Sequence, residues 1–460
     1  MNLREVHFDD AGPRAREVAR SVAEAGFSVV VVRDFVGRFT LLLDNGNRPV
    51  GAEILERWRT QLRERLGGYA SDEPLLLGSD LFHPKSLLAS SRRVVAQESP
   101  DSGSAKVYRL DNTVVGEEWS RVTASPSEPG TEAARTSRTT LYGFKGGVGR
   151  STATYLLGRH LAGQGRCVLI VDLDLESPGA GPLLLDEDHI PAFGVVDHLV
   201  EAAVGNADDL DLVARASHLS VEGNGELWVA PARGGGFRGP QAVPYSYVDK
   251  LNRVYADVPR AGEDPLSFAD RLEEAVAACE RRVAKLSRRP DVVLLDSRAG
   301  IHDIAAVAIS RLCDYALLFG SDNGQTWRGY EDLFQEWQES GQAQKIREKL
   351  RVVASMVPAN RRGEYLESFR DHAMQAFSLL YDDVPARREG EAFTPDLEAF
   401  NPDLEDESAP HAPIPILFTA DLVGLDSART PGWCEQPFVH AAYEEFLHVA
   451  GRLVMNEDTP

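Results

Sequence analysis

A glycine-rich loop stands between an apolar run and a helical stretch in the segment LYGFKGGVGRSTATYLLGRHLAG, residues 141–163. Glycines let the backbone curl so that consecutive N–H groups face inward, and the following helix adds the positive end of its dipole. These groups form a nest that suits phosphate oxygens. A tight turn without a ligand is the alternative interpretation, but two aspartate motifs further along the chain favour a phosphate site.

Apolar runs recur between helical stretches after residue 139. Strands buried on both faces have this pattern, and helices between them imply right-handed crossovers and a mostly parallel sheet. We therefore predict a doubly wound α/β fold for residues 139–455, with insertions at 234–264 and 386–413. The expected strands cover residues 140–144, 167–171, 227–230, 291–295, 315–319, 351–356 and 414–418.

The chain before this region has a different character. The pattern of residues 1–120 predicts a small α+β domain. These residues resemble no family that we can name, and the role of the domain stays open. Residues 121–138 are rich in Ser, Thr, Pro, Gly and Ala, lack apolar periodicity and are interpreted as a linker. The small domain is expected to hold strands at 28–32, 39–43 and 106–110 and a helix at 52–66.

Composition limits the classes of protein to which the chain can belong. No apolar run approaches the roughly 20 residues that cross a bilayer, and the first residues lack the apolar core of a secretory signal. The four cysteines form no CxxC pair, which fits a reducing cytoplasm. A formal net charge of -22 disfavours nucleic acid and anionic lipid as partners, although a local basic patch could still bind either.

A cation and two hydroxyl groups follow the glycines of the loop. Ser151 is placed to give its hydroxyl to Mg²⁺, and Thr152 to touch an inner phosphate. Arg150 stands where a phosphate loop normally has lysine. Because a guanidinium is longer, planar and forked, it cannot simply take over a lysine's point contact between the β- and γ-phosphates. We therefore expect nucleotide turnover to be slow or absent.

Carboxylates end two of the predicted strands. Asp172 and Asp174 follow the run VLIV, and Asp296 follows VVLL in DVVLLDSRAG. Carboxylates at the ends of parallel strands point into the crevice where ligands of open α/β folds bind, so they can reach a metal ion or water beside the phosphates. Capping of a helix or turn is the alternative for the first pair.

These three motifs together resemble those of the ParA/MinD-type P-loop ATPases, of the SIMIBI class. That family's deviant Walker A motif reads KGGVGK[ST], and its second switch segment reads DSPAG, where Arg298 replaces the proline here. Arg298 either stabilises phosphate charge or ties the segment to an acidic neighbour, and we favour the tie. The resemblance covers roughly residues 139–455 and implies ATP and Mg²⁺ as ligands, with ATP preferred to GTP on the resemblance alone.

The resemblance also implies roles for individual residues. Lys145 is the signature lysine that reaches the phosphates across a dimer interface, and Asp174 positions or activates the attacking water. With Arg150, these residues are expected to act in catalysis. The expected metal ligands are Ser151, Asp172 and Asp296. The expected nucleotide contacts are Gly146, Gly147, Val148, Gly149, Arg150, Ser151, Thr152 and Gly300.

Proteins of this family use ATP to control dimerisation and partner binding. The resemblance therefore implies a nucleotide-dependent homodimer that recruits or regulates an unidentified partner protein, in a bacterial regulatory or defence setting. One alternative is a ParA-like DNA-binding protein that uses the basic helix CERRVAKLSRRP, residues 279–290, although a solvated or partner-docking face is favoured there. The other is a non-hydrolysing nucleotide-binding scaffold. The acidic C-terminal segment argues against membrane attachment.

Overall fold

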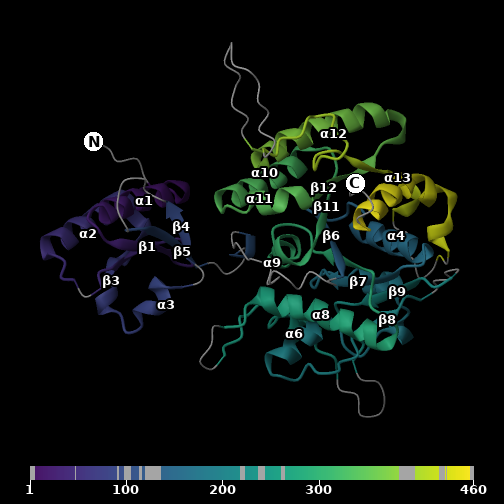
Figure 1. Ribbon diagram of the computed structural model, residues 1–460, viewed down its shortest axis with the longest axis horizontal. Helices are drawn as coiled ribbons and strands as arrows, with labels where there is room; N and C mark the ends of the chain where they lie inside the picture. Colours follow the sequence, from purple (N-terminus) through teal and green to yellow (C-terminus); the bar gives the residue numbers. More distant parts are fainter. Residues whose placement is uncertain are drawn as a thin grey trace. The chain divides into compact units, whose positions relative to one another are not determined.

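The chain divides into two compact units, Met1–Glu117 and Glu118–Pro460, in a computed structural model (Figure 1). No helix of the described residues is long and apolar enough to cross a membrane. The described residues are 6–46, 48–90, 93–97, 105–112, 117–119, 136–217, 223–236, 244–260, 265–382, 399–423, 430 and 432–455.

The first unit is an α+β structure built on a five-stranded sheet with the strand order β3-β2-β1-β5-β4. Alternation places Val29 and Val31 of β1 against helices α1 and α2, while Val30 faces a smaller cluster on the other side of the sheet. The small α+β domain is thus present, and α2 has the predicted bounds. The elements are α1 Phe8–Glu24, β1 Ser28–Arg33, β2 Phe39–Asp44, α2 Ala52–Leu66, β3 Ala70–Leu77, α3 Pro84–Leu88, β4 Val94–Gln97 and β5 Val107–Asp111.

The second unit contains an eight-stranded sheet with the order β13-β12-β11-β6-β10-β7-β9-β8. Its described pairings are parallel except that between β8 and β9. The strands are β6 Ser137–Gly143, β7 Cys167–Leu173, β8 Ala214–Arg215, β9 Glu226–Ala230, β10 Val292–Ser297, β11 Tyr315–Gly320, β12 Leu350–Val357 and β13 Ile414–Leu417. The predicted doubly wound, mostly parallel sheet is confirmed.

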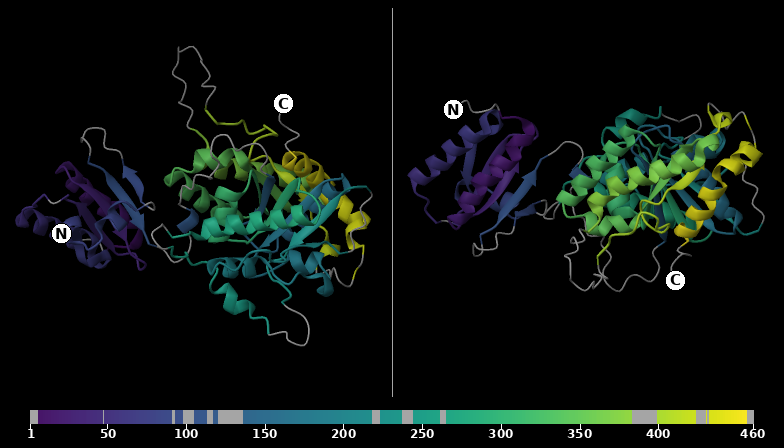
Figure 2. Two further views of the ribbon diagram at one scale, coloured as in Figure 1. Left: turned by 60° about the horizontal axis from the view of Figure 1, so that its bottom comes forward. Right: turned by 90° about the horizontal axis from the view of Figure 1, so that it is seen from above.

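Helices cover both faces of this sheet (Figures 1 and 2). In β7, Val168 and Ile170 face the core beneath α4 and α13, whereas Leu169 and Val171 face the core beneath α6 and α8. Burial on both sides explains why the strand sequences are apolar without alternation. The helices are α4 Arg150–Gly163, α5 Ala180–Leu184, α6 Val195–Ala203, α7 Tyr247–Leu251, α8 Phe268–Leu286, α9 Asp303–Val307, α10 Gly324–Glu339, α11 Ala343–Ile346, α12 Arg362–Phe377 and α13 Pro437–Val454.

The boundary of the predicted linker needs one correction. Strand β6 begins at Ser137, inside the predicted linker 121–138, because residues 137 and 138 pair with the start of β10. The Arg138 amide also donates to Asp314, and its guanidinium pairs with Glu280 at 2.8 Å. Residues 121–135 of the predicted linker and 386–398 of the second insertion lie outside the described residues.

Two glycines let backbone segments approach closely beside α6. A Cβ atom on Gly194 would lie 2.6 Å from the carbonyl oxygens of Pro231 and Ala232. A Cβ atom on Gly234 would lie 2.5 Å from the carbonyl oxygen of Ala192. Because these neighbours are backbone atoms, they cannot rotate away, and the loop after β9 can pack on α6 only where side chains are missing.

We expect Gly194→Ala to lower the free energy of unfolding by about 2 kcal/mol or more, since overpacking against backbone forces the chain apart. Gly163→Ala is the matched control, because its Cβ would meet no atom within 4 Å in helix α4. The control should be neutral or stabilise by up to about 1 kcal/mol. Urea unfolding followed by tryptophan fluorescence measures both, and equal midpoints for the two variants would contradict the packing argument.

Candidate functional site

The glycine-rich loop joins β6 to α4 and forms one wall of a cavity. Gly147 and Gly149 both have φ of 79°, a conformation that favours glycine, and Cβ atoms on Gly146 or Gly147 would meet nothing within 4 Å. The cavity measures about 490 Å³. Its lining comprises Lys145, Gly146, Gly147, Val148, Gly149, Arg150, Ser151, Thr152, Asp174, Ser177, Arg298 and Ala299. The structure thus brings the predicted loop and Asp174 to one site.

Arg150 joins two of the predicted carboxylates in a buried ion-pair network. Its Nε donates to Asp296 Oδ1 at 2.8 Å, and its Nη2 donates to Asp174 Oδ2 at 2.9 Å. The Arg150 side chain is 9% exposed and the Asp296 side chain is fully buried. The forked guanidinium therefore spans the ends of β7 and β10, which a single ammonium group cannot do in the same way.

The three charges of this network depend on one another. Burial opposes the charge on Arg150, but Asp296 and Asp174 offset it, so the pKa of the Arg150 guanidinium is raised. Burial also raises the pKa of the Asp296 carboxyl, although Arg150 and Ser151 favour its ionised form. A buried charge without its partner is strongly destabilising. Arg150 is thus the counter-ion that lets two carboxylates lie buried at the base of the site.

Asp172 has a different environment from the other two aspartates. Its Oδ1 accepts the Asp174 amide at 3.1 Å, and its Oδ2 accepts the amides of Gly179, Ala180 and Gly181 at 3.1, 3.0 and 3.3 Å. Burial and the nearby Asp296 carboxylate raise the pKa of Asp172 to about 8. These four bonds fit the capping interpretation of Asp172, and its predicted place among the metal ligands stays a prediction.

The site offers oxygen donors for a metal ion and open space for phosphate groups. Asp296 Oδ2 is buried and has no hydrogen-bond partner among the described residues. A carboxylate oxygen of this kind suits a hard cation, and the Ser151 hydroxyl beside it is a second oxygen donor. The open space over Gly146 and Gly147 leaves the loop amides room to meet phosphate oxygens. The site fits both groups.

Lys145 and Gly300 lie at the rim of the site. Lys145 is exposed, and its Nζ donates to Gln325 Oε1 at 3.1 Å at the start of α10 of the same chain. Gly300 has φ of 80°, and its amide donates to the Gly143 carbonyl at 3.2 Å. Gly300 is not among the residues that line the phosphate cavity, and its predicted nucleotide contact stays a prediction.

Arg298 ties the two aspartate-containing segments together. Its Nη1 pairs with Glu176 Oε2 at 2.5 Å, and Glu176 also contacts the Tyr255 hydroxyl. The favoured interpretation of Arg298 as a tie to an acidic neighbour therefore agrees with the structure. The sequence did not identify Glu176 as the partner, because no local pattern shows which of several acidic residues will face an arginine more than a hundred positions away.

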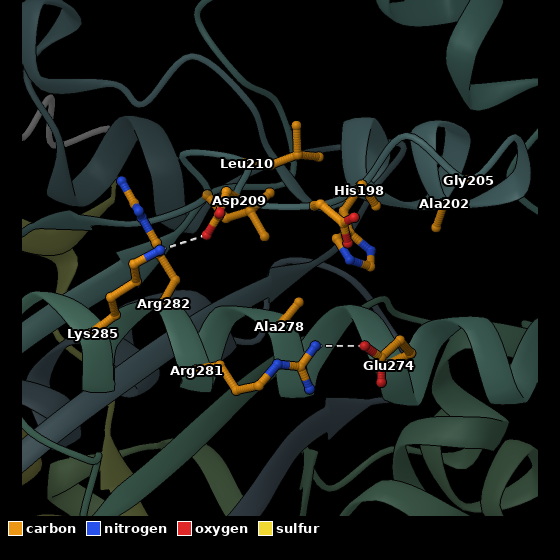
Figure 3. A pocket seen from close by; sticks show the side chains of 13 residues that line it. His198, Ala202, Gly205, Asp209, Leu210, Glu274, Ala278, Arg281, Arg282 and Lys285 are labelled. Carbon is orange, nitrogen blue, oxygen red and sulfur yellow. Dashed lines mark hydrogen bonds and ion pairs between the residues drawn. The ribbon is translucent and has the colours of Figure 1, made fainter.

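Three basic residues in the C-terminal half of α8 are paired with acidic ones. Arg281 contacts Glu274 at 2.5 Å, and Lys285 contacts Asp209 at 2.6 Å, as Figure 3 shows. Arg282 contacts Asp211 at 3.0 Å. The three cations line a cavity of about 560 Å³ between α6 and α8, together with Glu274 and Asp209. Because each of these three cations already has an acidic partner, the positive charge that this part of the helix offers to a phosphate backbone is weakened.

A parallel sheet with a glycine-rich loop between a central strand and a helix, and carboxylates at the ends of neighbouring strands, defines the P-loop class of nucleotide-binding proteins. Residues 139–384 match the family model described as the CobQ/CobB/MinD/ParA nucleotide binding domain. This match spans more than half of the chain, which belongs to that family. The resemblance to ParA/MinD-type P-loop proteins is confirmed.

Solved structures of similar proteins include the MinD cell division protein of Aquifex aeolicus, with 16% identity over 71% of this chain and 99% of its own, at a TM-score of 0.39. The ParA of pNOB8 has 16% identity over 70% of this chain and 100% of its own, at 0.41. Cobyrinic acid a,c-diamide synthase from Mycobacterium smegmatis, with an ATP analog and magnesium bound, has 20% identity over 69% and 95%, at 0.38. No curated protein matches the chain. The family assignment rests on the family model.

We expect Arg150→Met to lower the free energy of unfolding by about 3–5 kcal/mol, because it leaves two buried carboxylates without their counter-ion. Arg150→Lys should lose less, since it keeps the charge but not the fork. Arg281→Met, which removes an exposed pair, should change stability by about 1 kcal/mol at most. Urea titrations of the nucleotide-free protein compare the three. An Arg150→Met variant as stable as the surface control would show that the network contributes nothing.

Proposed function

We propose that this protein is an ATP-binding, slowly hydrolysing molecular switch that dimerises with nucleotide and recruits or regulates a partner protein. The observation that carries the proposal is the cavity in which the glycine-rich loop, Arg150 and the carboxylates of two strand ends meet. The N–H groups of the loop and Arg150 would hold the triphosphate within one subunit, and Lys145 would add its charge across the dimer interface. Membership of the CobQ/CobB/MinD/ParA family supports a nucleotide as the ligand.

The metal would be held on the floor of the same cavity. Asp296 offers an oxygen that has no partner among the described residues, and Ser151 offers its hydroxyl. Asp172 would support this shell from its capping position at α5. When bound, Mg²⁺ neutralises phosphate charge, while Asp174 would orient the attacking water. Asp174 can do this only after Arg150 releases its Oδ2, which is a reason to expect slow turnover.

The dimer would be completed by Lys145. Its ammonium group lies on the surface of this chain, where it donates to the exposed Gln325 side chain, so it can be withdrawn at small cost. This exposure supports the role that the family resemblance implies, in which the lysine of one subunit reaches the phosphates of the other. Nucleotide would then act as a crosslink between subunits, and its loss would let them separate.

A second candidate function is a nucleotide-binding scaffold without hydrolysis, and the Arg150 network favours it. In the present conformation both acidic groups needed for water and metal chemistry are engaged by one guanidinium. If the ion pair between Arg150 and Asp174 persists in the nucleotide complex, Asp174 cannot orient the attacking water. The DNA-positioning alternative receives no such support, because Arg281, Arg282 and Lys285 of α8 are each paired with an acidic side chain of the same chain.

Calorimetry with Mg·ATP should give saturable heat, and the protein should elute as a dimer on a sizing column that contains nucleotide. Lys145→Ala should still bind nucleotide but remain a monomer, because only the cross-subunit contact is removed. Lys285→Ala, an exposed lysine away from the loop, serves as the control and should behave like wild type. If calorimetry shows no binding of Mg·ATP to the wild type, the proposed function is overturned. If the wild type stays monomeric with ATP on the sizing column, the proposed nucleotide-dependent dimer is overturned.

Phosphate release separates the switch from the scaffold. The wild type should release phosphate slowly, Arg150→Lys should be faster by roughly tenfold, or ~1.4 kcal/mol of barrier, and Asp174→Ala should be inactive. Release by Arg150→Lys with none by wild type would establish the scaffold.

A DNA gel shift with Mg·ATP at low salt tests the DNA-binding candidate. A retarded band that is lost when the basic residues of α8 are neutralised would restore that candidate.

A further inference from the structure

The first two residues of the second unit are packed into its core. Trp119 is 2% exposed, and its ring lies 5.8 Å from that of Trp337 and 6.1 Å from that of Tyr142. Its carbonyl accepts a hydrogen bond from Gln342 Nε2 at 2.8 Å, in a buried setting. Glu118 is buried as well. The chain arriving from the first unit is therefore anchored here, although the sequence placed these residues in the small domain next to a linker.

The anchored residues touch the loop that follows Asp296 by two routes. The Glu118 amide donates to Asp303 Oδ1 at 3.3 Å, at the first residue of α9. Tyr142, which packs on Trp119, donates its hydroxyl to the Gly300 carbonyl at 3.1 Å. Both ends of the short segment between Gly300 and Asp303 are thus held by Glu118 or by a direct neighbour of Trp119.

Gly300 is held on its other side by the strand that leads into the phosphate loop. Its amide donates to the Gly143 carbonyl, so it cannot donate to a phosphate in the same conformation. If nucleotide draws the Gly300 amide toward a phosphate, the bond to the Gly143 carbonyl must break, and a shift of the segment strains the bond between the Gly300 carbonyl and Tyr142. The Tyr142 ring is fully buried between Trp119 and Tyr330, so it cannot follow freely.

We propose that Glu118 and Trp119 form a latch that holds the Gly300 segment in the conformation in which its amide binds the Gly143 carbonyl, and that passes nucleotide binding on to the chain leading to the first unit. The inference rests on the proposed nucleotide site. By linkage, the docked latch reduces the free energy of nucleotide binding, and opening the latch restores that free energy. Weakening the latch therefore tightens nucleotide binding, and nucleotide binding loosens the latch.

A purely structural role for Trp119 makes a different prediction. Loss of a buried indole would then lower stability and leave nucleotide affinity unchanged. Phe377→Ala is the matched control, because Phe377 belongs to the same core cluster, is 1% exposed and packs on Phe334 rather than on the Gly300 segment. Trp119→Phe keeps an aromatic ring beside Tyr142 and should restore most of the wild-type behaviour.

The test measures the Kd for Mg·ATP by calorimetry on the full chain. Trp119→Ala should bind at least fivefold more tightly than wild type, and Phe377→Ala should bind as wild type does. Gln342→Met removes the side-chain hydrogen bonds to the Trp119 carbonyl and to Ser340 Oγ and leaves the indole in place, and it should shift Kd in the same direction if Trp119→Ala fails to fold. Hydrogen exchange in the peptide with Glu118 and Trp119 should become faster when nucleotide binds.

The outcomes distinguish the latch from the function on which it rests. If wild type binds nucleotide but neither Trp119→Ala nor Gln342→Met changes Kd, the latch is overturned and the nucleotide site stands. Slower exchange in the Glu118–Trp119 peptide with nucleotide would reverse the direction of coupling and overturn it as well. If wild type binds no Mg·ATP, the proposed function is overturned and the latch with it.

Discussion

The ion pairs of Arg150 with Asp296 and Asp174 are the interaction on which the site depends. Parallel strands bring carboxylates to the same edge of the sheet. Burial there makes two such charges costly unless a cation lies between them. A forked guanidinium on the first turn of α4 satisfies this requirement with two hydrogen bonds. The residue that departs from the usual phosphate loop is therefore the residue that holds this loop to the strands below it.

The same region contains further ties between segments far apart in the chain. Glu176 forms an ion pair with Arg298. In the insertion after β9, the Tyr247 hydroxyl donates to the Leu175 carbonyl at 2.5 Å. Gly300 is held between Gly143 and Tyr142. Each tie is a charge pair or a hydrogen bond between segments near the phosphate loop, and Arg298 itself lines the phosphate cavity. The arrangement suits a conformational switch.

Charge pairing also explains how a strongly acidic chain can contain a basic helix. Arg281, Arg282 and Lys285 lie close together on α8, but each meets an acidic side chain from α8 itself or from the loop before β8. The local field is therefore much weaker than the sequence of the helix indicates, and the net charge of -22 governs the surface at long range. This is why a basic run on one element is a weak sign of nucleic-acid binding.

Much of the architecture followed from patterns of short range. The glycine-rich loop with its flanking strand and helix, the apolar strands and the aspartates at their ends are all contiguous features, and the structure has them where they were expected. What the pattern could not show was the use of each acidic group. Asp172 and Asp174 are two residues apart in one motif, yet one is surrounded by backbone amides and the other meets a guanidinium.

The sequence by itself determined the fold class, the phosphate loop and the family, because these depend on periodicity and on residues that are neighbours in the chain. Only the tertiary structure decided that Arg150 binds Asp296 and Asp174, that Arg298 binds Glu176, and that Trp119 belongs to the core of the second unit. These contacts join residues 24 to more than 200 positions apart. Their free energy depends on burial and on the geometry of several elements together, which no local pattern records.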